Sequence, residues 1–449
     1  MPGTCARTLL RHIPICAVLL GLGSALPGAT AAAAEPEWHH ATALTGTPKY
    51  PADAKHFEYV NPDAPKTGSV RLSSSGGFDT FNVVSPKGNM APGLQLVYES
   101  LMETALDEAD ISAQYGVLAE AMRYPEDYSW VEYRMNPNAR WHDGKPVTAE
   151  DVVWSFQTAT EIDPRQKFYY KNVVKAETLP GEIVRFEFDV SENRELPHIM
   201  GQLTILPKHW WLGTNEKGEA RDVTRSTLEP PLGSGAYRIK DFSANRQVTY
   251  ERVQDYWGAD LPIRVGTYNF DEIRYISFLD QSVEFEAFKG DQYDYRVERS
   301  ASQWAKAYNF PAVRKGEVVL EEFADKGSGV MQAFVPNLRR EKFQDPRVRQ
   351  ALNYAYDFET TNEIVSANLL KRIGSYFAGT DLASTGLPEG KELEILEEVR
   401  DQVPAEVFTT EYKNPVGGNK RNVRNNLRQA VKLLGEAGYK LDGRKMVNT

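Results

Sequence analysis

The segment 141–156 constrains the fold more than any other part of the chain. Its sequence, WHDGKPVTAEDVVWSF, opens with a polar turn in which Gly144 is free to take a positive φ. Thr148 is the expected N-cap of a helix, and Asp151 occupies the third helical position, as in a capping box. The apolar face of this helix comes from Val152, Val153 and Phe156.

Just upstream, residues 130–135 alternate as a strand does, which places Val131, Tyr133 and Met135 on one face. The whole unit is therefore a strand, a turn and a capped helix. His142 and Asp143 in the turn also allow a second interpretation, in which they serve an enzyme. A turn without any attached reaction is favoured, because such polar turns are common structural features.

The longer segment LAEAMRYPEDYSWVEYRMNPNARWHDGKPVTAEDVVWSF resembles the signature of the bacterial extracellular solute-binding proteins of family 5. These are receptors of ATP-driven importers for oligopeptides, dipeptides and nickel. The phrases VYESL, ILPKHWW, PLGSGAYRI and FQDPRVRQALNYAYD are similar to further family segments. The opening YPADAKHFEYVNPDAPKTGSVRLSSSGGFDTFN is most similar to the Yej-type subgroup, which is linked to microcin C and related oligopeptides.

The resemblance implies an α/β, two-lobed periplasmic binding protein of type II (the Venus-flytrap fold) with an extra inserted domain. It implies a discontinuous domain I at 35–95 and 203–325, an inserted domain II at 96–202, and a domain III at 326–449. Family members continue past this point, so domain III is expected to be incomplete at its carboxyl end. A chain of 449 residues has room for two or three such domains.

The resemblance also implies a function. The chain would be the periplasmic subunit of an ABC importer, a monomer without cofactor that captures oligopeptides or peptide-like compounds. Its lobes would close over the ligand and deliver it to a permease with ATPase subunits. A different solute in the same architecture, such as a glycan, an opine or a metal chelate, is the alternative. A secreted hydrolase using His142 or His209 is the remote alternative.

The first 34 residues predict a cleavable secretory signal peptide. Arg7 and Arg11 precede an apolar run over 13–26, and small residues follow up to Ala34. Both cysteines, Cys5 and Cys16, lie in this segment without a lipobox, so we expect a mature periplasmic chain without lipid anchor, disulfide or thiolate chemistry. Cleavage removes two Arg and no acid, which takes the formal charge from -10 to -12.

An acidic chain of this kind is not expected to bind nucleic acid, because phosphate binding needs clustered Lys and Arg. The sequence does not indicate a basic patch typical of membrane-surface binding either. His39 and His40 are adjacent but lack a nearby third ligand, so we expect no metal site.

The candidate ligand-binding residues in domain I follow an early strand predicted at 68–72. In open α/β sheets, ligands lie beyond the carboxyl ends of strands, so the loop 73–82 is a candidate cleft wall. It contains Ser74, Ser75, Phe78 and Asn82. Lys87, Gly88 and Asn89 fall where the family presents backbone to an extended ligand.

The remaining candidates lie farther along the chain. Arg296 and Glu298 leave a predicted strand and are expected to face the cleft. Strands are predicted at 319–323 and 330–334, where the resemblance implies the crossover into the last domain. Phe323, Ser328 and Gln332 are the candidates there.

Four helices and a hairpin complete the prediction. Helical spacing indicates helices at 94–106, 283–288 and 426–437, and a helix capped by Asp345 with Pro346 at its first position. Val348, Ala351, Leu352 and Ala355 form the buried stripe expected of that helix. Residues 439–447 predict a hairpin around an Asp-Gly turn.

Overall fold

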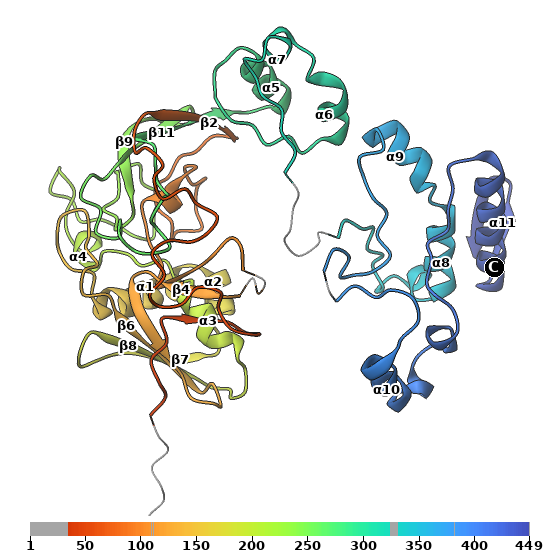
Figure 1. Ribbon diagram of the computed structural model, residues 1–449, viewed down its shortest axis with the longest axis horizontal. Helices are drawn as coiled ribbons and strands as arrows, with labels where there is room; N and C mark the ends of the chain where they lie inside the picture. The colour runs from red at the N-terminus through yellow and green to blue at the C-terminus, as the bar shows by residue number, and fades with distance from the viewer. Residues whose placement is uncertain (1–34, 109, 111, 324–330, 381, 449) are drawn as a thin grey trace, which may run out of the picture.

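The computed structural model describes residues 35–108, 110, 112–323, 331–380 and 382–448. The predicted signal peptide and the candidate Ser328 lie outside these residues. Figure 1 shows two sheet-containing regions in the amino-terminal part, a small group of helices in the middle, and a carboxyl-terminal group of helices.

The first sheet has the strand order β2-β11-β10-β9. β2 (Ser69–Ser75) runs parallel to β11 (Glu272–Phe278), and β10 (Gln247–Arg252) and β9 (Tyr237–Ser243) continue the sheet antiparallel. One face carries a core that includes Phe78, Phe81, Val97, Tyr237, Val248 and Tyr250. The early strand predicted at 68–72 is confirmed as β2.

The second sheet is antiparallel throughout, with the order β5-β6-β8-β7. Its strands are β5 (Ala119–Arg123), β6 (Trp130–Met135), β8 (Ile183–Phe188) and β7 (Val173–Leu179). The helices α1 (Ala149–Ile162) and α2 (Pro164–Tyr169) belong to the same unit. The predicted capping box is confirmed, because Thr148 Oγ1 accepts from Asp151 N and the Asp151 carboxylate accepts from Thr148 N.

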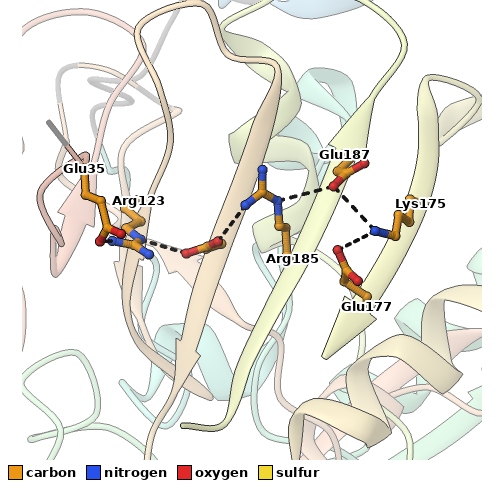
Figure 2. A network of polar contacts seen from close by, with 7 residues as sticks. Glu35, Arg123, Lys175, Glu177, Arg185 and Glu187 are labelled. Carbon is orange, nitrogen blue, oxygen red and sulfur yellow. Dashed lines mark hydrogen bonds and ion pairs between the residues drawn. The ribbon is translucent and has the colours of Figure 1, made fainter. Parts of the chain in front are cut away.

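The core face of β6 is the predicted one, since Val131, Tyr133 and Met135 are all buried. The opposite face carries alternating charges from strand to strand (Figure 2). Glu132 is buried between Arg123 at 2.7 Å and Arg185 at 3.2 Å. Each of these strands thus offers a charge of opposite sign to its neighbour, which stabilises the sheet across its width.

A third, small sheet joins the amino-terminal arm to this body. β1 (Ala41–Thr42) pairs with β4 (Gln114–Gly116), which also pairs with β3 (Met102–Thr104). Tyr50 and Phe57 of the arm pack against Tyr115. This amino-terminal arm, which includes residues 41–57, therefore contributes a strand and a core cluster of its own.

The helix predicted at 94–106 is wrong. Only a short 3-10 turn, η1 (Leu94–Leu96), forms there, and β3 follows. The carbonyl of Val97 accepts from Gly235 N at 2.8 Å, and the carbonyl of Leu101 accepts from Val117 N. Because these carbonyls have partners far along the chain, they are not used for a helix, although the apolar side chains are buried as expected.

The middle of the chain forms α5 (Gln281–Lys289), α6 (Ala301–Ala307) and α7 (Pro311–Arg314), around a core of Phe285, Tyr308 and Phe310. The helix predicted at 283–288 is confirmed as α5. The strands predicted at 319–323 and 330–334 are not found in the described residues of either segment. Val319 and Phe334 are exposed there, with no neighbouring strand to share backbone hydrogen bonds.

The carboxyl-terminal part is mostly helical. It contains η2 (Glu341–Phe343), α8 (Pro346–Ala355), α9 (Phe358–Ser366), α10 (Gly390–Glu398), η3 (Arg400–Gln402), η4 (Ala405–Phe408) and α11 (Lys420–Glu436). The predicted hairpin is formed by β12 (Tyr439–Asp442) and β13 (Lys445–Asn448).

The cap predicted for α8 is confirmed, because the Asp345 side chain accepts from Arg347 N. The stripe predicted on this helix is only half correct. Val348 and Ala351 are buried, but Leu352 and Ala355 are exposed. The sequence pattern identifies the apolar face of a helix, and it does not reveal how much of that face finds a partner.

Candidate functional site

The carboxyl ends of β2 and β11 form the structural centre of the candidate site. These two strands run parallel, with Ser74 opposite Ser277 and Ser75 opposite Phe278. β2 extends through Ser75, so the expected loop begins at Gly76 and not at Ser73. Gly76 N then donates to Phe278 O at 2.8 Å. Two adjacent parallel strands that end together create the kind of edge where α/β sheets bind ligands.

The loops that leave this edge are tied to each other. Asp79 Oδ1 accepts from Asn89 N at 2.6 Å, and Ser226 Oγ donates to Lys87 O at 3.0 Å. Gly88 has a φ of 85°, and a Cβ there would lie 2.6 Å from Asp79 Oδ1. Only glycine fits this position, and it leaves the exposed Lys87, Gly88 and Asn89 backbone at the surface.

Two candidates from the same loop lie in the interior. Phe78 is fully buried in the core of the first sheet. Asn82 is also fully buried, and its amide donates to the carbonyls of Val223 and Arg225, both at 2.8 Å. This corrects the expectation that they contact ligand, because their side chains hold the loop and are not accessible.

Arg296 and Glu298 are also not free surface charges. Arg296 lies 3.3 Å from both Glu298 and Glu284, and it donates to Tyr293 Oη at 3.0 Å and to Tyr308 Oη at 3.2 Å. Glu284 in turn accepts from Ser73 Oγ of β2 at 2.6 Å. The pair therefore links the α5–α7 group to the edge of the first sheet. Its hydrogen-bonding groups are used within the protein and do not face a cleft.

Electrostatics supports this structural role. Burial opposes the charge on the Arg296 guanidinium, but its hydrogen bonds to Tyr293 and Tyr308 outweigh burial and keep its pKa above the usual value. Burial, together with Glu298, raises the pKa of Tyr308. Both groups hold their usual protonation state at neutral pH, so the network is a fixed tie between the two elements.

At the crossover, the structure leaves the candidates exposed. Phe323 and Gln332 are exposed, and Ser328 lies outside the described residues. Within the described part of the chain, no hydrogen bond, ion pair or ring contact joins Phe323 or Gln332 to the loops of the first sheet. The structure thus shows two separate groups of accessible candidates.

An aromatic group that was not predicted from the sequence begins two residues after Gln332. Phe334 is 88% exposed and lies 5.9 Å from the ring of Tyr356, which in turn lies 6.4 Å from Phe358. The Arg372 guanidinium lies over Tyr356 and Phe358 and donates to Asn353 Oδ1 at 2.7 Å. The sequence AFVP could have indicated this aromatic group. Side chains alternate between the two faces of an extended segment, so at least one of these apolar residues would point outward.

Among the described residues, neither histidine of the hydrolase alternative contacts a nucleophilic side chain. His142 Nε2 contacts the carbonyl oxygen of Gly235 at 2.8 Å, and burial lowers the pKa of this imidazole. His209 Nε2 contacts Asp143 Oδ2 at 2.8 Å. His209 lies in the short helix α4 (Lys208–Trp211).

One histidine does contact a hydroxyl. His198 of α3 (Glu195–Gly201) has its Nε2 3.2 Å from Thr42 Oγ1 of the arm. Both side chains are buried, so no substrate can reach the pair, and burial lowers the pKa of His198. This contact anchors the arm. Among the residues that the structure describes, no group of three His, Cys, Asp or Glu is placed to hold a metal ion.

Comparison with known families and proteins identifies the architecture. The family model described as "Bacterial extracellular solute-binding proteins, family 5 Middle" matches residues 114–448. The chain is 51% identical, over 94% of its length and 69% of the other chain, to the probable peptide-binding protein YejA of Agrobacterium fabrum. It is 38% identical, over 98% of its length and 72% of the other chain, to the peptidoglycan-binding protein YepA of the same organism. The chain thus spans about two thirds of the length of these relatives.

Among solved structures, the oligopeptide-binding protein AppA of Bacillus subtilis in complex with a nonapeptide is similar in fold. The TM-score is 0.56 at 17% sequence identity, over 86% of this chain and 67% of the other. The predicted α/β fold of type II periplasmic binding proteins is confirmed. In the part of the chain that the structure describes, no helix is both long and apolar enough to cross a membrane.

Proposed function

The chain belongs to the bacterial extracellular solute-binding proteins of family 5, and we propose that it captures peptides or peptide-like compounds for an ABC importer. The observation that carries this proposal is the 51% identity to a probable peptide-binding protein over 94% of the chain. Family and relatives are binding proteins and not enzymes. The contacts of His142 and His209 agree with this function, since neither pairs with a hydroxyl.

The ligand would be held between two walls. The first wall is the edge of the first sheet with Ser74, Ser75 and the loop of Lys87, Gly88 and Asn89. Its exposed backbone can pair with an extended peptide, as a sheet edge does. The second wall is the crossover with Phe323, Ser328 and Gln332, to which we add Phe334 and Tyr356. Exposed aromatic rings bury a large ligand surface at low conformational cost.

The assignment of domains stays a proposal. The second sheet lies within residues 119–188, inside the proposed inserted domain of 96–202. Val97 and Tyr98 pack in the core of the first sheet, whereas Leu101 and Met102 pack in that of the second. The change from one domain to the other would therefore fall between Tyr98 and Leu101.

Delivery needs partners that the resemblance implies. The protein would act as a monomer in the periplasm, after cleavage of the predicted signal peptide, and present its ligand to a membrane permease with ATPase subunits. Closure of the two walls would be favoured only when ligand contacts both, so that the permease can distinguish loaded from empty receptor.

A second candidate ligand class is a glycan or a glycan-linked peptide. It is favoured by the 38% identity to a peptidoglycan-binding protein over nearly the whole chain. The same two walls would serve this ligand, because aromatic side chains also stack on sugar rings. An opine or a metal chelate would need a charged or metal-ligating group at the walls.

Thermal-shift screening separates these classes. We expect short synthetic peptides to raise the unfolding temperature in proportion to the logarithm of their concentration, because they bind only the folded state. A shift with peptidoglycan fragments and none with peptides would move the assignment to the second class. No shift with any peptide or glycan would contradict the proposal.

The wall itself is tested with a matched pair of variants. Phe334→Ala is expected to weaken the binding of the best ligand about tenfold, as truncation of an aromatic anchor does. Phe168→Ala removes another exposed ring, in α2 and far from either wall in the sequence, and should leave affinity unchanged. Equal affinities for both variants would remove Phe334 from the site.

A further inference from the structure

The chain crosses twice between the cores of the two sheets, which lie at different ends of the amino-terminal part (Figure 1). The first crossing is at 98–101 and the second at 203–206. The two crossings are paired, because Ser100 forms an antiparallel bridge with Thr204, and Ile205 N donates to Glu99 O at 3.2 Å. Two backbone crossings of this kind commonly form a hinge, since few contacts need to change when the two bodies move.

A buried ion pair lies at the first crossing. Arg264 is 4% exposed and donates to the Glu99 carboxylate at 2.5 Å. Glu99 is equally buried and also accepts from the Tyr256 hydroxyl. Arg264 donates as well to Glu103 of β3, whose neighbour Met102 packs in the core of the second sheet. One guanidinium therefore holds carboxylates on either side of the point where the chain changes from one core to the other.

Arg264 belongs to a loop, 253–268, that contacts three hydrophobic clusters of the amino-terminal part. Tyr256 packs against the core of the first sheet. Trp257 packs against the core of the second sheet and against the cluster of the arm. Ile263, the residue before Arg264, is buried in the cluster of the arm. The loop therefore joins both sheets and the arm, and Arg264 is its buried cation.

We propose that Arg264 locks the paired crossings, so that the two sheets form one rigid body and do not move about this connection. Rotation of one sheet against the other would separate the guanidinium from Glu99 or from Glu103. Among the described residues, no other Lys or Arg contacts Glu99, so the separation would leave a buried carboxylate without a cation. Such a state is strongly unfavourable. Arg264 is therefore a positioning residue for the two sheets.

The charges of this cluster favour a permanent lock. Burial opposes the charge on Arg264, but Glu99 and Glu103 outweigh burial and hold the pKa of the guanidinium above its usual value. Burial raises the pKa of the Glu99 carboxyl, whereas Arg264 and Tyr256 act in the opposite direction. When a neutral residue replaces Arg264, the main force against burial is lost. Glu99 would then take up a proton or turn toward water, and either change loosens the crossing.

The inference is independent of the proposed peptide ligand, because none of these residues belongs to either proposed wall. It states where movement on ligand binding does not occur, which is between the two sheets. Peptide binding could be absent in experiment while the orientation of the two sheets stays fixed. A mobile connection could equally be found in a chain that binds peptides.

Distances between two spin labels on the full chain test the lock. Cys5 and Cys16 are the only cysteines of the sequence, so both are first changed to serine. Labels are then attached through Ser243→Cys in β9 and Thr178→Cys in β7, which are both exposed positions. We expect one narrow distance distribution, unchanged when peptide is added. Arg264→Gln should broaden it about twofold, because Glu99 loses its cation.

A milder variant keeps the test decisive if Arg264→Gln does not fold. Glu103→Gln removes one of the two carboxylates, at a side chain that is 43% exposed, and should broaden the distribution less than Arg264→Gln does. Circular dichroism shows whether each variant is folded. If Arg264→Gln is unfolded, an unchanged distribution in Glu103→Gln overturns the proposal.

The matched control is Arg221→Gln. Arg221 pairs with Glu229 at 2.7 Å and lies over the ring of Trp210, but both partners follow the second crossing, as Arg221 does. This variant should lower the unfolding temperature and leave the distance distribution narrow. Equal broadening in both arginine variants would overturn the proposal. So would a broad distribution in the parent chain, a shift on adding peptide, or a narrow distribution in folded Arg264→Gln.

Discussion

The two sheets of the amino-terminal part and the helices of the carboxyl-terminal part use the same residue types in different ways. In the second sheet, Val131, Tyr133 and Phe186 are fully buried, and Glu132 lies between two arginines. In the carboxyl-terminal part, Leu352 and Leu427 are half exposed. Burial and charge pairing in the first region provide stability, whereas open faces in the second region are available for further contacts.

The largest expected difference concerns the cores. Phe186→Ala should cost about 3–5 kcal/mol, because the ring is fully buried and leaves a cavity. Leu427→Ala should cost less than about 1 kcal/mol, since the side chain is already in contact with water. Urea unfolding followed by circular dichroism measures both. Similar costs for the two variants would contradict the comparison.

The next effect concerns the charges across the second sheet. Glu132→Gln should destabilise the fold by about 2 kcal/mol, because Arg123 and Arg185 lose the carboxylate between them. Both arginines keep a second carboxylate, which limits the loss. The matched control is Glu187→Gln on the same face, whose contacts are longer and more exposed, and we expect below about 0.5 kcal/mol.

Two helix caps of the same kind sharpen the comparison further. Thr148→Ala and Asp345→Ala each remove a side-chain acceptor from a helix start, at about 1 kcal/mol. The first should lower the main thermal transition, which contains the two sheets. The second should affect only a lower transition, because the core of α8 and α11 is small. A single transition that both variants shift equally would show one cooperative unit.

The smallest expected effect is on pH dependence. Burial lowers the pKa of His142 and of His198 from 6.5 in the folded state. Their contribution to stability is complete above pH 6.5. It is lost as pH falls towards the folded-state pKa, because the unfolded chain then binds protons that the folded chain does not. The free energy of unfolding should therefore decrease in mild acid, and less so in His198→Gln. An increase in mild acid would contradict the burial of these imidazoles.

Local signals were predicted well from the sequence. The caps of Thr148 and Asp345 have their partners two or three residues away, so the pattern contains everything that the geometry needs. Strand alternation likewise identified the core face of β6.

Contacts between distant segments were not predictable in this way. The segment at 94–106 has helical spacing, yet the backbones of Gly233 and Gly235 approach Val97 closely, and Gly235 N donates to the Val97 carbonyl. Asn82 looks like an accessible polar side chain in the sequence, but it is enclosed by carbonyls from a segment more than 140 residues away. Arg296 looks accessible as well, but nearby residues fold back onto it, among them Tyr293 and Tyr308. The candidates that stay accessible are those that no other segment covers. The sequence pattern does not show which segments pack over a given residue.

Hydrogen exchange with and without a bound peptide tests the central claim most directly, which is that the ligand lies between the loops of the first sheet and the crossover. We predict slower exchange in residues 76–90 and 331–336 when the best peptide from the thermal-shift screen is present, and unchanged exchange in the second sheet. Slower exchange confined to the second sheet around Arg123 and Arg185, with none at either wall, would contradict the account.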